Sequence, residues 1–238
     1  MENILKIDKI EKYYGNKSSL TKAIDNLSFD VEKGEFVAIM GASGSGKTTL
    51  LNILSNYDKN YTGVISIDRK KMNKVDYLDM PVAYAMDQPS FFNELTIYEN
   101  LLLIASSRKI KKQEAFDKIE RILDGLGLKK YENYSPLELS KGTMQRLNNA
   151  CAMIQEEKIT IFDEPFSGLD PVQMKLLENV IVEFHKKEKG IYIISSHDIE
   201  CLQNVCDKCL LLHNGQIREI NMEEVDREEI AKILSEGE

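Results

Sequence analysis

Residues 36–50 constrain the fold more than any other stretch of this chain. The five apolar residues Phe36–Met40 predict a buried strand, and a glycine-rich turn follows them directly. This turn has the pattern G-x-x-x-x-G-K-T from Gly41 to Thr48, and Thr49 begins a stretch with helical apolar spacing. Glycines let successive N–H groups turn inward around an anion, and a helix start presents its positive dipole end to the same place. The sequence therefore predicts a strand, a phosphate-binding loop and a helix.

The side chains of this loop suit a nucleotide and its metal ion. Lys47 supplies a positive charge for the β- and γ-phosphates, and Thr48 supplies a hydroxyl for Mg²⁺. The alternative is a glycine-rich turn with a lysine by chance, but the flanking strand and helix favour the functional interpretation. The residues expected to surround the phosphates are Gly41, Ala42, Ser43, Gly44, Ser45, Gly46, Lys47, Thr48 and Thr49.

Composition excludes several other classes of protein. The net charge of −8, from 39 acidic and 31 basic residues, argues against a nucleic-acid-binding surface. No apolar run is long enough to span a bilayer, and the N-terminus lacks a signal-peptide layout. Cys206-x-x-Cys209, flanked by His197 and His213, raises the alternative of a zinc site, but no second C-x-x-C supplies further ligands. We expect a protein on the cytoplasmic side whose membrane association comes through a partner.

The remaining patterns predict an α/β fold. Short strands are expected at 36–40, 64–68, 81–86, 159–162 and 191–194. Antiparallel pieces are expected at 3–14, at 27–31 and in a hairpin over 209–220. Between 88 and 154 the apolar spacing becomes helical, with a capping box at Thr96-Ile-Tyr-Glu99. The predicted arrangement is one domain over 1–238, with an α/β core (1–87 and 155–220), a helical insert (88–154) and an acidic tail (221–238).

Three polar side chains follow two of the predicted strands. Asp163 and Glu164 end the strand at 159–162, so they are expected at the carboxyl edge of the sheet, where such folds bind ligands. Asp163 is predicted to hold Mg²⁺ opposite Thr48, and Glu164 to polarise a water molecule in line with the γ-phosphate. His197 follows the next strand, where a γ-phosphate sensor is favoured over a merely hydrogen-bonded edge residue.

A set of motifs, in order and spacing, resembles the ATP-binding subunit of an ABC transporter. The matching stretches are Gly41–Thr48, Gln88, Leu139–Arg146, Ile159–Pro165, Ser167–Asp170 and His197. The resemblance implies a P-loop NTPase (RecA-like) parallel core with an N-terminal antiparallel β subdomain and an inserted α-helical subdomain that carries the Leu-Ser-x-Gly signature. It also implies an ATPase that binds ATP and Mg²⁺.

The resemblance implies that the site is completed by a second copy. In this family a homodimer or pseudo-dimer of ATPase subunits meets head to tail, with each ATP between the phosphate loop of one and the signature of the other. Ser140 would cap the helix that carries Gly142 and Gln145, and this helix start would face the γ-phosphate across the interface. Asp170 would contact the opposite subunit.

Further roles follow from the same resemblance. Gln88 would reach the metal and the attacking water, while Phe91 and Phe92 in its loop would touch integral membrane permease subunits. The protein would then lie at the cytoplasmic face of the membrane as a peripheral subunit. Tyr14 matches the aromatic residue that stacks on adenine, and Tyr13 is the competing choice.

One position departs from the family pattern. The usual signature has two glycines after the serine, whereas this chain has Lys141 before Gly142. Lys141 narrows the backbone freedom there and is expected to alter dimer closure. Because Glu164 and His197 are both present, we expect an active ATPase.

Two other classes of function compete with a transporter ATPase: a non-transport ABC ATPase and a small-molecule kinase. Ser140 comes only 52 positions after Gln88, which leaves no room for the coiled coils of DNA-repair relatives. A single phosphate loop disfavours translation-type relatives. The alternative of a cell-division type ATPase, whose membrane partner transports nothing, also agrees with the sequence. A small-molecule kinase would leave the signature unexplained. The compact layout resembles exporters of peptides, lipoproteins and antimicrobial peptides more than importers.

Overall fold

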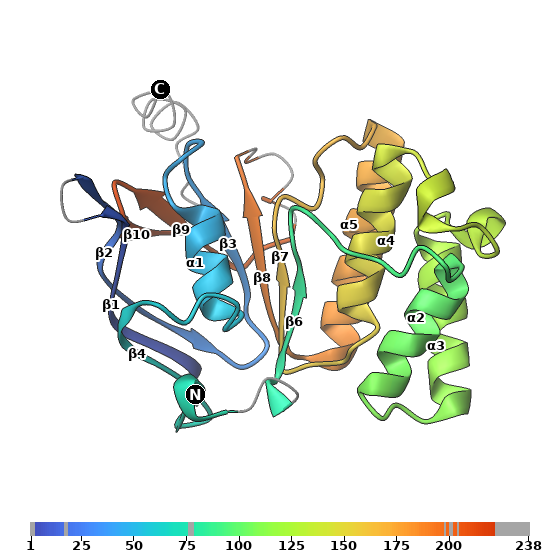
Figure 1. The fold of residues 1–238 in the computed structure, drawn as a ribbon, viewed down its shortest axis with the longest axis horizontal. Coiled ribbons are helices and arrows are strands. Elements are labelled where there is room, and N and C mark those ends of the chain that lie inside the picture. The colour runs from blue at the N-terminus through green and yellow to red at the C-terminus, as the bar shows by residue number, and fades with distance from the viewer. Residues whose placement is uncertain are drawn as a thin grey trace.

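A six-stranded sheet forms the centre of the molecule, with strand order β10-β9-β3-β8-β7-β6 (Figure 1). The computed structural model describes residues 3–16, 19–75, 79–197, 199, 202–203 and 205–221. The strands of this sheet are β3 (Phe36–Met40), β6 (Val82–Ala85), β7 (Ile159–Phe162), β8 (Ile191–Ser196), β9 (Lys208–His213) and β10 (Gln216–Asn221). Neighbours from β9 to β6 are parallel, and only β10 is antiparallel, to β9. The carboxyl ends of five strands therefore meet at one edge.

A second, antiparallel sheet stands beside the first, with order β2-β1-β4-β5. Its strands are β1 (Asn3–Asn16), β2 (Ser19–Glu32), β4 (Thr62–Ile67) and β5 (Lys70–Lys71). The sequence predicted only 27–31 of β2, because the first half of this strand is mostly exposed and shows no apolar alternation. The register places one extra residue, Ala23, in β2 between the pairs Lys12–Ile24 and Tyr13–Lys22.

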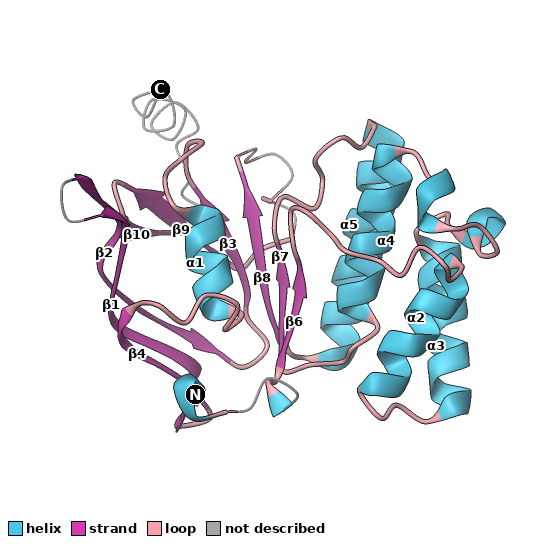
Figure 2. Cartoon of the chain, viewed as in Figure 1, coloured by secondary structure: helices cyan, strands magenta, loops and turns pink. Residues whose placement is uncertain are grey.

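The described residues form five α-helices: α1 (Lys47–Leu54), α2 (Ile97–Ser107), α3 (Lys112–Gly125), α4 (Lys141–Met153) and α5 (Pro171–Glu188) (Figure 2). The capping box predicted before α2 is confirmed, since the Glu99 N–H donates to Thr96 Oγ1 at 3.1 Å and the Thr96 N–H donates to Glu99 Oε2 at 2.8 Å. Asp170 caps α5 with Pro171 in its first turn, as the sequence predicted. No helix in the described ranges is both long and apolar enough to cross a membrane.

The central strand β3 is apolar throughout because it faces two hydrophobic cores. Phe36, Ala38 and Met40 point into a core shared with α2, α3, α4 and α5. Val37 and Ile39 point into the other core, with α1 and the antiparallel sheet. All five are at most 1% exposed, as expected for a strand covered on both faces.

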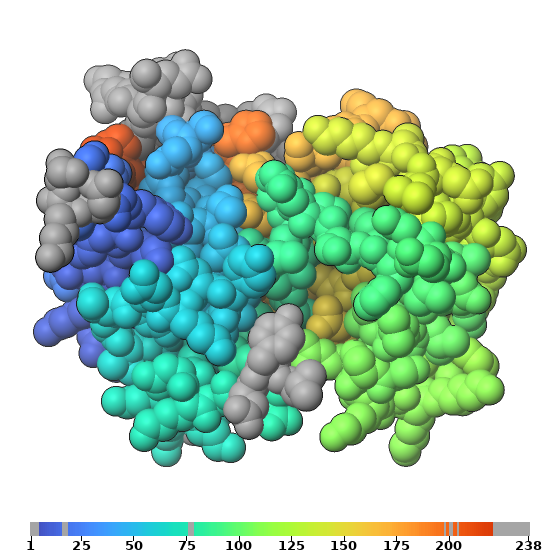
Figure 3. Space-filling view, in the orientation of Figure 1, coloured from blue at the N-terminus to red at the C-terminus, as the bar shows by residue number. Residues whose placement is uncertain are grey.

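The predicted fold class is confirmed, with an α/β parallel core, an antiparallel sheet near the N-terminus and helices α2–α4 within the predicted insert. In the space-filling view the blue-to-cyan first part of the chain and the green-to-yellow helical part form two adjacent masses (Figure 3). The boundaries 1–87, 88–154 and 155–220 stay predictions. Nearly all of the predicted tail, 222–238, lies outside the described residues.

Candidate active site

The predicted phosphate loop joins the end of β3 to the start of α1. A side chain at Gly41 would place its Cβ 2.4 Å from Ser45 Oγ and 2.5 Å from the Leu212 carbonyl oxygen. Gly46 has a φ of 104°, and a Cβ there would lie 2.8 Å from the Ala23 carbonyl oxygen. The extra residue of β2 thus packs directly on the loop, and both positions require glycine.

Lys47 points into this loop. It is 8% exposed, and its Nζ donates to the carbonyl oxygens of Gly41 at 2.7 Å and Ala42 at 3.0 Å. Burial lowers the pKa of Lys47, and the nearby carboxylates of Glu164 and Asp163 oppose this shift.

Ser45 supplies an independent observation that the loop fits a phosphate. Its hydroxyl oxygen is buried and has no hydrogen-bond partner in the described part of the chain. Buried hydroxyls are normally satisfied, so the loop holds a donor suited to a phosphate oxygen beside the ammonium of Lys47.

Asp163 is buried behind the loop at the end of β7. It is 1% exposed, and Ser195 in β8 donates from its Oγ to Asp163 Oδ1 at 2.6 Å. The Tyr84 hydroxyl of β6 lies 3.4 Å from Asp163 Oδ2 and 3.1 Å from Asn52 Oδ1 in α1. Burial raises the pKa of Tyr84, with the charge of Asp163 adding to the effect, so this hydroxyl stays a donor. The carboxylate is therefore fixed from two neighbouring strands.

Glu164 is held in an unusual backbone conformation next to Asp163. Its φ is 45°, a left-handed value that residues with side chains rarely adopt and that often marks functional sites. Its N–H donates to Ser195 Oγ at 2.8 Å, and its carbonyl oxygen accepts from Gln145 Nε2 at 3.3 Å. Its side chain lies between His197 Nδ1, 3.1 Å from Oε2, and Lys47 Nζ, 3.9 Å from Oε1.

The structure thus brings four of the predicted site residues together at the carboxyl edge: Lys47, Asp163, Glu164 and His197. Thr48 is exposed at the start of α1. Gln88 follows β6 at the same edge and is also exposed. Within the described residues no hydrogen bond or ion pair joins Gln88 to another predicted site residue. The oxygen donors of Thr48, Gln88 and Asp163 are of the type that Mg²⁺ prefers.

The predicted signature lies at the start of α4. Ser140 caps this helix, and its Oγ accepts from the Thr143 N–H at 3.3 Å. A Cβ at Gly142 would lie 3.2 Å from the Gly168 carbonyl oxygen, so α4 begins against the loop that leads to Asp170 and α5. Gln145 is predicted to reach a nucleotide across the interface. In this structure its Nε2 donates a hydrogen bond to the Glu164 carbonyl oxygen of the same chain.

The two candidate aromatic residues lie on opposite sides of β1. The Tyr14 hydroxyl is 3.4 Å from Thr49 Oγ1 in α1, next to the phosphate loop. Tyr13 instead has the Lys22 ammonium 5.4 Å from its ring centroid. Of the two, Tyr14 lies beside the predicted nucleotide site.

Comparison with known proteins identifies the family to which this chain belongs. The sequence profile of the ABC transporter family matches residues 24–167. The chain belongs to this family. It is 33% identical over 220 residues to a bacitracin export ATP-binding protein of Halalkalibacterium halodurans, covering 90% of this chain and 87% of that protein. It is 32% identical over 213 residues to a lipoprotein-releasing system ATP-binding protein of Rickettsia typhi, covering 89% and 96%.

A solved structure has the same fold. It is a dimeric post-hydrolysis state of the ATP-binding cassette MJ0796 bound to ADP and Pi, with a TM-score of 0.82 and 25% identity over 92% of this chain and 99% of that one. The protein described here is accordingly an ABC ATPase that binds and hydrolyses ATP and powers a transporter.

Sequence reasoning missed three side chains of this ABC ATPase site: Ser195, Tyr84 and Asn52. Ser195 had a usable signal, because a serine that ends an otherwise apolar strand beside Asp163 needs a buried partner. Tyr84 lies in a strand and Asn52 in a helix, and packing alone explains the apolar pattern of both elements. No local sequence signal therefore identified these two residues as part of the site.

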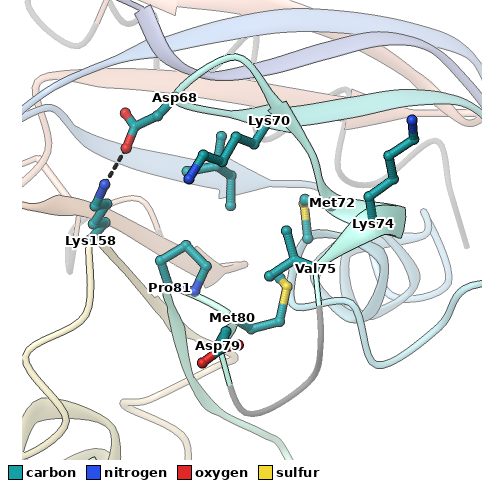
Figure 4. Close-up of a pocket in the computed structure, with 10 residues that line it drawn as sticks. Asp68, Lys70, Met72, Lys74, Val75, Asp79, Met80, Pro81 and Lys158 are labelled. Atoms are coloured by element: carbon teal, nitrogen blue, oxygen red, sulfur yellow. Dashed lines mark hydrogen bonds and ion pairs between the residues drawn. The ribbon is translucent and has the colours of Figure 1, made fainter.

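A hollow of about 490 Å³ lies at the opposite edge of the core, near the starts of β6 and β7 (Figure 4). Lys158 pairs with Asp68 at one side of it, while Lys70 lines it from β5 and Lys74 from the short 3-10 helix Met72–Lys74. None of the predicted site residues lines this hollow.

Proposed function

We propose that this ABC ATPase hydrolyses ATP at the edge formed by Lys47, Asp163, Glu164 and His197, and that hydrolysis drives a separate integral membrane permease. One observation carries the proposal: the Glu164 carboxylate lies between the Lys47 ammonium and the His197 ring, beside the phosphate loop. A carboxylate in that place is suited to orient a water molecule and accept its proton.

Each of these side chains has a distinct task in the proposed reaction. Lys47 neutralises charge on the β- and γ-phosphates. Glu164 takes the water proton, and His197 holds the Glu164 carboxylate in place and contacts the γ-phosphate. Mg²⁺ would be held by Thr48, Asp163 and Gln88, and when bound it supplies further positive charge at the phosphates.

We also propose that a second copy completes the site. The signature stretch of one chain is exposed at the start of α4, where a helix dipole favours an anion. The dimeric structure of the related cassette supports such an assembly. Contacts between the γ-phosphate and the opposite Ser140 and Gly142 would exist only in the closed dimer, which is the differential binding that a switch requires. Gln145 and Asp170 are proposed to support the same interface.

Export is the proposed direction, with a peptide, lipid-like or antimicrobial substrate. The bacitracin export and lipoprotein-releasing relatives support it, because this chain spans 87% and 96% of their lengths. A spermidine/putrescine import relative from Bacteroides fragilis is 29% identical, and the chain spans only 47% of it. The second candidate is an ATPase that regulates a non-transporting membrane partner. In either case the protein would be a peripheral subunit at the cytoplasmic face of the membrane, without a nucleic-acid partner.

The test is isolation of the tagged full chain from membranes of its own cells in mild detergent. We expect an integral membrane protein to copurify and steady ATP hydrolysis without any added phosphoryl acceptor. A partner with substrate-dependent stimulation of hydrolysis supports export, whereas a partner without a translocation pathway supports the second candidate. Absence of hydrolysis in the copurified complex would contradict both.

A further inference from the structure

Lys12 is a buried cation in the antiparallel sheet, outside the phosphate loop. It is 3% exposed, and its Nζ pairs with Asp58 Oδ2 at 2.7 Å and donates to the Asn60 carbonyl oxygen at 2.6 Å. Both partners lie between α1 and β4. A buried ammonium is costly without such partners, so these contacts fix the Lys12 side chain in one place.

The same ammonium lies against the aromatic ring beside the nucleotide site. Lys12 Nζ is 4.9 Å from the centroid of the Tyr14 ring, within the range of about 6 Å over which a cation is attracted to a ring face. The two residues are two apart in β1, so their side chains project from the same face of the strand. The Tyr14 hydroxyl is 3.4 Å from Thr49 Oγ1. The ring is thus fixed at its face by Lys12 and at its hydroxyl by α1.

Tyr14 nevertheless keeps a surface open to a ligand, since 45% of the residue is exposed. A ring that has a buried cation against one face and is still partly exposed has the form of a stacking platform. Fixing such a platform in advance lowers the entropy lost when a flat ligand stacks on it.

Tyr13 and Lys22 form a similar pair in a different setting. Lys22 Nζ is 5.4 Å from the Tyr13 ring centroid, on the other side of β1. The Lys22 side chain is 34% exposed and pairs with Glu11 and Asp25 near the surface. This second pair has the same chemistry, but its cation is held by partly exposed carboxylates and not by the loop between α1 and β4, so it provides a matched control.

We propose that Lys12 is a positioning residue that acts through Tyr14 to strengthen binding of the nucleotide's purine base. The inference rests on the proposed function, in which Tyr14 stacks on adenine. A cation at one face of a ring draws its electron density toward that face and leaves the opposite face less negative. The electron-rich face of a purine then stacks on it more favourably. Lys12 contributes to affinity for the base and not to affinity for the phosphates.

The test compares Lys12→Met with the unchanged chain, using ATP and inorganic tripolyphosphate as the two probes. Methionine keeps the length of the side chain and removes its charge. We expect the Kd and KM for ATP to rise about two- to five-fold, because the Lys12–Tyr14 contact exists with and without nucleotide and only part of a cation–π contribution affects stacking. The kcat and the Kd for tripolyphosphate should stay unchanged. Lys22→Met should change none of these values. Lys12→Arg, which keeps the cation, should restore ATP affinity.

Two outcomes would overturn the inference. Equal losses for ATP and tripolyphosphate would show that Lys12 acts only through the local fold, and unchanged ATP affinity would show that it has no role in binding. Should Lys12→Met not fold, Asp58→Asn frees the ammonium from its anchor and is expected to weaken ATP binding selectively, by a smaller factor. An equal effect of Asp58→Asn on both probes would likewise overturn it.

Tyr14→Leu separates this inference from the proposed function. If Tyr14→Leu leaves ATP affinity unchanged, the stacking role of Tyr14 is wrong. If Tyr14→Leu weakens ATP binding and Lys12→Met does not, only the role of Lys12 is wrong. In the Tyr14→Leu background, Lys12→Met should cause no further loss, because the coupling between the two residues is then already removed.

Discussion

Two regions of this ABC ATPase differ in how many contacts their residues make within one chain. They are the phosphate-loop side, with Lys47, Asp163 and Glu164, and the signature side, with Ser140–Gly142. On the first side, Glu164 has partners within the chain on its N–H, its carbonyl oxygen and both carboxylate oxygens. On the second side, Ser140 and Lys141 are exposed at the start of α4. The difference indicates that the proposed hydrolytic groups are held by contacts within a single copy, whereas these signature residues are exposed and, under the proposed function, gain their partner from a second copy.

The largest effect is expected from Glu164→Gln, which removes the proposed proton acceptor from the phosphate-loop side. The amide keeps the size of the side chain but cannot accept a proton from water. Turnover should fall about 10²- to 10⁴-fold, the usual contribution of a general base, while the Kd for ATP stays within a small factor. Steady-state phosphate release and nucleotide titration measure the two quantities.

Glu183→Gln on α5 is the control for this change, because the Glu183 side chain is 67% exposed and far from the loop in sequence. It should leave turnover unchanged. Loss of ATP binding in Glu164→Gln would contradict a purely hydrolytic role.

Gly142→Asp places a negatively charged side chain in the signature at the start of α4. A side chain at this position would lie 3.2 Å from the Gly168 carbonyl oxygen, and its negative charge would oppose the γ-phosphate of the second copy. Turnover should fall about 100-fold, since like charges brought together cost several kcal/mol, while one copy alone still binds ATP normally. Gly142→Ala adds bulk without charge and should lose less. Equal losses in the two variants would mean that packing, and not the phosphate contact, decides the effect.

Ser195→Ala tests whether the hydrogen bonds that hold Asp163 and Glu164 matter for turnover. This serine is fully buried and bonds to both Asp163 and the Glu164 N–H. Loss of a buried hydrogen bond to a charged group is worth about 1.5–3 kcal/mol, so kcat should fall roughly ten- to a hundred-fold. Ser106→Ala, an exposed serine in α2, serves as the control. Unchanged kcat in Ser195→Ala would show that the Asp163 carboxylate does not need this support.

The smallest effect is expected from Lys141→Gly, which restores the usual glycine of the family signature. Lys141 adds a positive charge in the first turn of α4, at the helix end that is proposed to face the γ-phosphate bound by the other copy. A charge near a helix end is worth about 0.3–1 kcal/mol, so the ATP concentration for half-maximal turnover should rise about two- to five-fold. Salt should shrink the difference between the two proteins. A decrease in that concentration would show that Lys141 hinders closure instead.

Local sequence was enough to predict the parts of the site that depend on neighbours in the chain. The strand and loop at 36–48, the Asp163-Glu164 pair at a strand end and the caps of α2 and α5 follow from short-range backbone chemistry. The first half of β2 was not predicted, because its residues pair with β1 while most of their side chains are exposed. The sequence there therefore shows no alternation of apolar residues.

Contacts between distant segments could not be predicted. The bonds of Ser195 to Asp163 and of Gln145 to the Glu164 carbonyl oxygen join elements whose separation only the folded sheet determines. The choice between Tyr14 and Tyr13 likewise needed the position of α1 beside β1, since both residues suit stacking equally well by type.

The mass of Glu164→Gln in solution tests the central claim most directly, namely that two copies are joined through the terminal phosphate of ATP. Light scattering with saturating ATP and Mg²⁺, and separately with ADP and Mg²⁺, measures this mass. We expect a dimer with ATP and a monomer with ADP. A monomer under both conditions would contradict it.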